Sequence, residues 1–123
     1  MSKQAQYEIK LKEVNEENLK EAVGRMAKEL DIPIMNKRKF KIGLHSEPVR
    51  GTCIKLTNAH YAADIYANDN EIVINTDSDN LSEYRAYQNR IKQFYEATEI
   101  SKEFNTEYDY NKETEKIEMK IYA

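Results

Sequence analysis

The longest helical pattern of apolar side chains lies in residues 81–104. At about 100° per residue, one side of this helix carries Tyr84, Tyr87, Ile91, Phe94, Tyr95 and Thr98. A continuous apolar stripe of this kind is typical of a helix that packs against a sheet. The opposite side carries the charged residues Glu83, Arg85, Lys92, Glu96 and Glu99, for which we expect exposure to solvent. The pattern therefore predicts one long helix with one buried face.

A second, smaller apolar stripe follows on the far side of the same helix and consists of Ala97, Ile100 and Phe104. Two arrangements explain this stripe. Either the helix breaks near residues 96–99, or it stays straight and presents a second apolar face. A second face requires a second partner, which is either another part of the chain or another subunit. We therefore take these three residues as a candidate interface.

The first thirty residues predict a strand followed by a helix. Residues 7–12 alternate between apolar and polar side chains, which indicates a half-buried strand. Asn15 precedes two acidic residues and an apolar helical repeat, so we expect a helix over residues 16–30. Pro33 ends it, because the residue before a proline is disfavoured in helical geometry.

Alternation and turn residues predict the remaining strands. The predicted segments are a strand with Phe40, Ile42 and Leu44 inward, a turn at 46–48, strands at 52–57 and 60–67, a turn at 68–70, and a strand at 71–76. We expect Asp77, Asp79 and Asn80 to cap the long helix. Residues 106–110 and 117–121 alternate again around a polar turn and predict a closing hairpin.

The element order that results is β-α-β-β-β-β-α-β-β. Separate runs of strands and helices predict an α+β fold, with a mainly antiparallel sheet and two helices packed on one face. A length of 123 residues and a hydrophobic content of 40% suit a single domain over residues 1–123.

The composition of the chain indicates the cellular compartment in which the protein is found. No apolar run approaches the roughly 18 residues that span a bilayer, and the first ten residues lack a signal-peptide core. Cys53 is the only cysteine, so no intramolecular disulfide is possible. We therefore expect a cytoplasmic protein without membrane contact. The frequent Asn, Lys, Glu and Ile residues are compatible with an AT-rich bacterium or a phage.

The chain resembles a small uncharacterised domain family first catalogued as a conserved plastid and cyanobacterial open reading frame, which also occurs in phages. The resemblance rests on the opening strand and helix, on the Asp64-Ile65 hairpin, on Gln93-Phe94-Tyr95, on the hairpin that follows, and on Val49-Arg50-Gly51. The chain departs from the family at Thr52, where an aromatic residue is expected, and near Asn105, where a glycine is expected. The resemblance implies one long helix from 81 to about 104, and it implies no function.

Charge is distributed unevenly along the chain. Residues 1–50 hold 11 Lys and Arg against 8 Asp and Glu, whereas residues 51–123 hold 8 against 14. The candidate anion-binding residues in the basic half are Lys37, Arg38, Lys39, Lys41 and Arg50. A basic strand with an aromatic residue can hold the phosphates of a nucleotide or a nucleic acid. The alternative is a solvated edge strand, on which lysines discourage pairing between sheets.

Two further groups of residues are candidates for a site. His60 and Asp64 share one face of a predicted strand, and His45 could join them in a metal or acid–base site. The alternative is that all three are surface residues, and we assign no catalytic residue and no metal ligand. Tyr84, Tyr87, Tyr95, Tyr108 and Tyr110 either line a pocket or form part of the core.

Three functions remain open from the sequence. The leading prediction is a non-catalytic binding or interaction domain that self-associates through Ala97, Ile100 and Phe104, without a cofactor. The second is a nucleotide or nucleic-acid binding protein, or one that binds another phosphate-bearing small molecule, through Lys37–Lys41 and Arg50. The third is a small metal-assisted enzyme at His45, His60 and Asp64. No glycine-rich phosphate loop and no paired-cysteine metal motif accompanies any of them.

Overall fold

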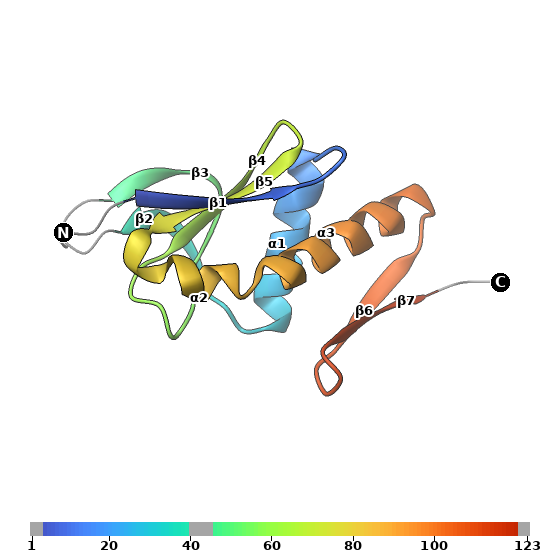
Figure 1. Ribbon diagram of the computed structural model, residues 1–123. Coiled ribbons are helices and arrows are strands. Elements are labelled where there is room, and N and C mark those ends of the chain that lie inside the picture. Colours follow the sequence, from blue (N-terminus) through green and yellow to red (C-terminus); the bar gives the residue numbers. More distant parts are fainter. Residues whose placement is uncertain (1–3, 40–45, 121–123) are drawn as a thin grey trace.

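The computed structural model describes residues 4–39 and 46–120 (Figure 1). Along the chain the elements are β1 (Gln4–Lys10), α1 (Glu16–Glu29), β2 (Ile34–Lys39), β3 (Ser46–Ile54), β4 (Ala63–Asn68), β5 (Glu71–Asp77), the 3₁₀ helix η1 (Ser78–Asn80), α2 (Leu81–Arg85), α3 (Gln88–Glu103), β6 (Glu107–Asn111) and β7 (Lys116–Lys120). The α+β class and the order of strands and helices are confirmed, except that the second helix is divided. No helix in the described ranges is long and apolar enough to cross a membrane.

Five strands form one antiparallel sheet in the order β1-β5-β4-β3-β2. Tyr7 of β1 and Ile65 of β4 both lie opposite Ile74 of β5, so these side chains share one face. The same core cluster contains residues of α1 and α3, including Met26 and Phe94. Helix α1 lies against β3 and β4 and helix α2 against β1 and β5, so the helices pack on one face of the sheet, as predicted.

Helix α1 begins where the sequence predicts. The Asn15 side chain caps its first turn and accepts a hydrogen bond from the Asn18 amide at 2.9 Å. The Asn15 amide in turn donates to the hydroxyl of Tyr95 in α3 at 2.7 Å. The apolar face of α1 is buried and consists of Leu19, Ala22, Val23, Met26 and Ala27. These contacts fix α1 between α3 and strands β3 and β4.

The prediction of one helix from 81 to 104 is wrong, because the helix divides at Ala86 and Tyr87. The Tyr87 amide bonds to the Tyr84 carbonyl at 3.0 Å, a spacing of three residues that tightens the turn. Helix α2 then lies against β1 and β5, whereas α3 lies against α1. A break at 96–99 is also not found, since α3 continues through these residues to Glu103.

The capping prediction before this helix is partly wrong. Asp77 caps the short η1 helix instead, because its carboxylate accepts a hydrogen bond from the Asp79 amide at 2.9 Å. The side chain of Asn80 accepts a hydrogen bond from the Tyr61 amide at 2.9 Å, and therefore holds the loop before β4.

Several predicted strand boundaries differ from the structure. The predicted turn at 46–48 is part of β3, and β3 ends at Ile54 rather than at residue 57. Pro48 is tolerated because β4 pairs with β3 only from Thr52, so the proline interrupts no ladder with β4. The predicted strand at 60–67 begins only at Ala63. The predicted positions of Phe40, Ile42 and Leu44 lie outside the described residues.

The first and last predicted strands are displaced by one to three residues. Strand β1 ends at Lys10 rather than at residue 12, and it begins at Gln4. The closing hairpin forms as predicted, with its strands at 107–111 and 116–120. It is a separate two-stranded sheet that lies beside α3, beyond the end of the main sheet (Figure 1).

Candidate functional site

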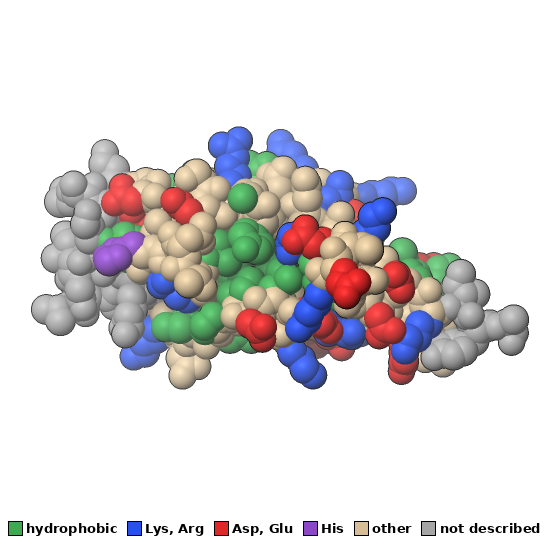
Figure 2. Space-filling view, turned by 90° about the horizontal axis from the view of Figure 1, so that it is seen from below, with side chains coloured by type: hydrophobic (Ala, Val, Ile, Leu, Met, Phe, Trp, Pro, Cys, Tyr) green, Lys and Arg blue, Asp and Glu red, His purple; other side chains and the backbone are tan. Residues whose placement is uncertain are grey.

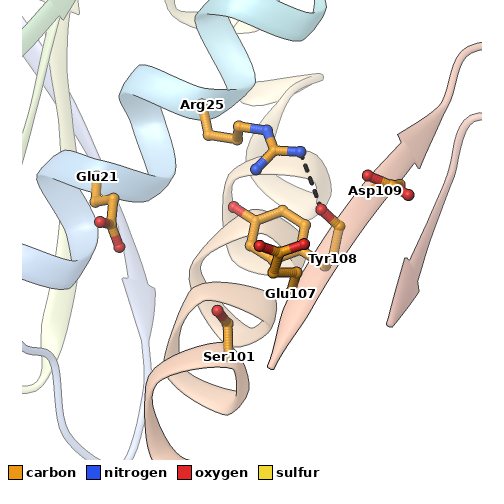
Figure 3. A pocket seen from close by; sticks show the side chains of 6 residues that line it. All are labelled: Glu21, Arg25, Ser101, Glu107, Tyr108 and Asp109. Carbon is orange, nitrogen blue, oxygen red and sulfur yellow. Dashed lines mark hydrogen bonds between the residues drawn. The ribbon is translucent and has the colours of Figure 1, made fainter. Parts of the chain in front are cut away.

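The β6–β7 hairpin borders two hollows on opposite sides. The first is a pocket of about 380 Å³ between α1, α3 and β6, and it is lined by Glu21, Arg25, Ser101, Glu107, Tyr108 and Asp109 (Figure 3). The guanidinium of Arg25 donates to the Tyr108 carbonyl at 3.0 Å and lies 4.7 Å from the centre of the tyrosine ring. Arg25 thereby joins the hairpin to α1.

Polar groups in this pocket bond mainly to one another. Arg25 also pairs with Glu29 at 3.0 Å, and Ser101 donates to the Thr106 carbonyl at 2.7 Å. Three carboxylates at the rim pair with lysines, in the pairs Glu21–Lys102, Glu107–Lys120 and Asp109–Lys120. The pocket lining contains no histidine or cysteine. The Ser101 hydroxyl donates to a backbone carbonyl rather than to a carboxylate, and the contacts of the pocket hold the hairpin in place.

The second hollow is a groove of about 350 Å³ between α3 and β7. It is lined by Gln93, Glu96, Ala97 and Ile100 of α3, and by Glu115, Lys116, Ile117 and Met119 at the start and along the length of β7. The predicted apolar stripe on α3 therefore has a second partner within the chain, which was one of the two alternatives. The sequence predicted that Ile117 and Met119 alternate with polar residues on a strand, but it gave no sign that α3 is the element they face.

Strand β7 covers the second apolar stripe of α3 only in part. Ala97 is buried, whereas 41% of Ile100 and 69% of Phe104 remain exposed. Ile34 is the other large apolar residue among the described ones that is exposed, and it lies in β2. We call Ala97, Ile100, Phe104, Ile117 and Met119 the α3–β7 surface. Figure 2 shows that acidic and basic side chains are interspersed over the end of the molecule that carries the hairpin.

The candidate anion-binding residues fall on the β2–β3 hairpin. Lys37 is exposed on β2 and lies opposite Pro48 of β3. Arg38 and Lys39 follow in β2, and Lys41 lies outside the described residues. Arg50 lies on β3 with its guanidinium 4.3 Å from the centre of the Tyr66 ring. The pairing of β2 with β3 thus brings Lys37 and Arg50 into one hairpin, while Arg50 already has an aromatic partner.

Asp64 has a structural role rather than a place on the surface. Its side chain is 3% exposed and accepts hydrogen bonds from the amides of Arg50 at 2.7 Å and Gly51 at 2.9 Å. The register of β2 and β3 shifts between Met35 and Lys37, so β3 bulges where these amides leave the ladder. The Asp64 carboxylate therefore accepts hydrogen bonds from two backbone amides in the bulge.

The proposed metal site receives no support from the geometry. His60 is exposed and packs edge-on against Tyr61, with ring centres 4.5 Å apart. His45 lies outside the described residues. Within 4–39 and 46–120, no group of three or more His, Cys, Asp or Glu residues is placed to hold a metal ion.

The tyrosines belong mainly to the core. Tyr84, Tyr95 and Tyr108 are buried, whereas Tyr87 and Tyr110 are half-buried. Burial raises the pKa of Tyr95 to about 12, and it also raises the pKa values of Tyr84 and Tyr108. The sequence could not distinguish this role from a pocket lining, because both use the same apolar spacing.

The Tyr84 hydroxyl links α2 to the loop between β3 and β4. It accepts a hydrogen bond from the Leu56 amide at 3.2 Å and donates to the Tyr61 carbonyl at 2.5 Å. The loop is therefore tied to a helix that follows it by more than twenty residues.

Comparisons with protein families, with curated proteins and with solved structures each found no match to this chain. The class that the structure defines is therefore an α+β domain with a five-stranded antiparallel sheet and a separate closing hairpin. The resemblance to the plastid and cyanobacterial family stays a prediction.

Proposed function

We propose that this chain is a non-catalytic interaction domain that self-associates through the α3–β7 surface. One observation carries the proposal: two exposed large apolar side chains, Ile100 at the groove and Phe104 at the C-cap of the same helix, are four residues apart. Contiguous exposed apolar surface on a folded domain commonly marks an interaction site. The pairing of charged groups in the neighbouring pocket supports binding rather than catalysis.

Burial of the α3–β7 surface would be favourable in free energy. Fully burying a side chain of the size of Ile or Phe stabilises by roughly 1.5–3 kcal/mol relative to leaving it exposed. Phe104 is the C-cap of α3 and follows Ile100 by four residues, about one helical turn, so one partner surface can cover both. In a symmetric dimer each copy contributes the same surface, which doubles the gain.

The first experiment measures mass in solution by sedimentation velocity over a range of protein concentrations. We expect a dimer or larger oligomer for the wild-type chain and a monomer for the double variant Ile100→Lys/Phe104→Lys. Lysine suits the last turn of a helix, so the fold is retained, whereas a desolvated ammonium disfavours the interface.

Ile34→Lys is the matched control, because it makes the same change at an exposed apolar residue in β2. We expect this variant to associate like the wild type. Identical masses for the wild type and the double variant at every concentration would contradict the proposal.

A second candidate function is the binding of a phosphate-bearing ligand on the β2–β3 hairpin. The observation that favours it is that strand pairing places Lys37 and Arg50 in the same hairpin. Retention of the protein on immobilised heparin should then fall with rising salt and be lost in Lys37→Glu/Arg50→Glu. Unchanged retention of this variant would leave the hairpin as a solvated edge.

The proposal places the protein in the cytoplasm. The support is that the sequence holds one cysteine, Cys53, so that no intramolecular disulfide can form.

A further inference from the structure

The two edges of the β6–β7 sheet have different surroundings. At the β6 edge, the Arg25 side chain of α1 donates to the Tyr108 carbonyl at 3.0 Å and so occupies a backbone acceptor of this edge. At the other edge, β7 pairs with β6 alone within residues 4–39 and 46–120. An unpaired strand edge is a template for a further strand. A partner strand added at β6 would displace Arg25 from the Tyr108 carbonyl, whereas one added at β7 meets no such contact among the described residues.

The direction of the backbone groups agrees with this. The Tyr108 carbonyl points away from β7, toward Arg25, which is typical of an antiparallel pair that exchanges no hydrogen bonds. Tyr108 lies opposite Met119, and the alternation repeats every two residues, so Ile117 is in the same position. The amides and carbonyls of Ile117 and Met119 are thus directed to the open edge.

The groove lies along this same edge. Its lining comes from α3 and from residues 115–119, with no contribution from β6. Ile117 and Met119 are half-buried, whereas Lys116, Glu118 and Lys120 are exposed on the other face of the hairpin. A strand added at β7 would extend the apolar face across the groove and toward the exposed Ile100. The extended sheet would also have more than two strands, whereas an isolated two-stranded sheet is only marginally stable.

Charges on the outer face of the hairpin determine which strand fits. Glu118 lies directly opposite Asp109, and two like charges in this position destabilise the pair. Lys120 lies 3.2 Å from Asp109 and 3.9 Å from Glu107, so it already has acidic partners. Lys116 has no ion-pair partner among the described residues. The strand that fits beside Glu118 therefore carries a free cation, and β7 itself carries one at Lys116.

We propose that a second copy of this chain adds its β7 antiparallel to β7, about a two-fold axis at Ile117. This inference rests on the proposed function and specifies its geometry. Lys116 of each copy then lies opposite Glu118 of the other, and each pair has opposite charges. An axis at Glu118 would instead place Glu118 opposite itself and Lys116 opposite Lys120, so that every outer pair would repel. The result is a continuous four-stranded sheet with both α3 helices on one face.

Charge exchange on β7 tests this geometry. The dissociation constant of the dimer is measured by sedimentation velocity for Lys116→Glu, for Glu118→Lys and for the double variant. We expect each single reversal to weaken the dimer at least tenfold, because it creates two like-charge pairs across the axis. The double variant exchanges the charges and should recover an affinity within about threefold of the wild type. Lys112→Glu, in the hairpin turn, is the control for a change in net charge and should have little effect.

The outcomes separate the two proposals. A dimer that is indifferent to the single reversals, or that the double variant does not restore, overturns the β7 pairing and leaves self-association intact. A wild-type chain that is monomeric at every concentration overturns both. A thermal melt of each variant shows whether it is folded. Disulfide formation between two cysteine variants gives an independent test of the pairing. With oxidised glutathione as the oxidant, equal mixtures of Lys116→Cys and Glu118→Cys chains should form a mixed disulfide, and neither variant alone should form one at the same rate.

Discussion

The hydroxyl of Tyr95 offers a quantitative test of the packing between α1 and α3. It accepts a hydrogen bond from the Asn15 amide at 2.7 Å and donates to the Glu13 carbonyl at 3.4 Å. The side chain is 1% exposed. At neutral pH, Tyr95→Phe should lower the free energy of unfolding by about 1–2 kcal/mol, the usual range for one or two such hydrogen bonds.

The effect of Tyr95→Phe should depend on pH, and the sign follows from the pKa of this phenol. Burial raises the pKa of Tyr95 in the folded state to about 12, from an ordinary value of 10.0. The folded state therefore keeps a proton that the unfolded chain loses above pH 10. The stability that Tyr95 contributes is complete below pH 10 and is lost progressively between pH 10 and 12. The loss amounts to about 1.4 kcal/mol at pH 11 and about 2.3 kcal/mol at pH 12, and it approaches about 2.7 kcal/mol at higher pH, since one pKa unit corresponds to about 1.36 kcal/mol.

The phenylalanine variant lacks this titration. The two proteins should thus differ by about 1–2 kcal/mol from pH 7 to pH 9.5 and become equally stable near pH 11. Urea unfolding followed by circular dichroism at half-unit steps of pH measures this difference. The contributions of Tyr84 and Tyr108, whose pKa values burial also raises, are common to both proteins and cancel.

Tyr7→Phe is the control, because Tyr7 is half-buried in β1 and its hydroxyl has no hydrogen bond among the described residues. Its stability should follow that of the wild type across the series. A stability difference between the wild type and Tyr95→Phe that stays constant from pH 8 to pH 11 would refute the reasoning.

Further predictions concern the packing of the sheet and its loops. Gly51→Ala should lower the free energy of unfolding by about 3 kcal/mol or more, because its Cβ would lie 2.1 Å from the Ile65 carbonyl oxygen. Gly24→Ala is the matched control in open space on α1, and it should raise stability by about 0.5–1 kcal/mol. Tyr84→Phe should cost about 2–4 kcal/mol in urea unfolding, since it leaves the buried Leu56 amide without an acceptor. An effect of Tyr84→Phe no larger than that of Tyr7→Phe would show that the hydroxyl contributes little.

The elements that could be predicted from the sequence are those whose cause is local. Helix α1 begins at Glu16 because Asn15 caps it, and β5 begins at Glu71 because Asp69 adopts a positive φ of 52° in the preceding turn. Both signals lie within a few residues of the structure they cause, so they can be read without knowledge of the fold.

Features with a distant cause were missed. No glycine or proline marks the break at Ala86 and Tyr87. Its two sides instead have different partners, because Tyr84 bonds to the loop at Leu56 whereas α3 packs on α1. The burial of Asp64 likewise depends on a bulge in β3 that no periodicity reveals.

The candidate site was predicted in part for the same reason. Spacing along one helix identified Ala97, Ile100 and Phe104 as a second apolar stripe. Spacing could not show that Ile117 and Met119 complete the surface, because that contact joins α3 to a strand that follows it. Only the tertiary arrangement reveals that the hairpin covers Ala97 and leaves Phe104 exposed.

The pairing of β1 with β5 has a consequence for folding during synthesis. Gln4 of β1 lies opposite Asp77 of β5, so β1 cannot pair until a segment more than seventy residues further along the chain has been synthesised. Strands β2 to β5 follow one another along the chain and can pair as they emerge, with β5 as a temporary edge. Contacts of such long sequence separation slow folding. We therefore expect the docking of β1 to be the late step that converts a four-stranded meander into the complete sheet.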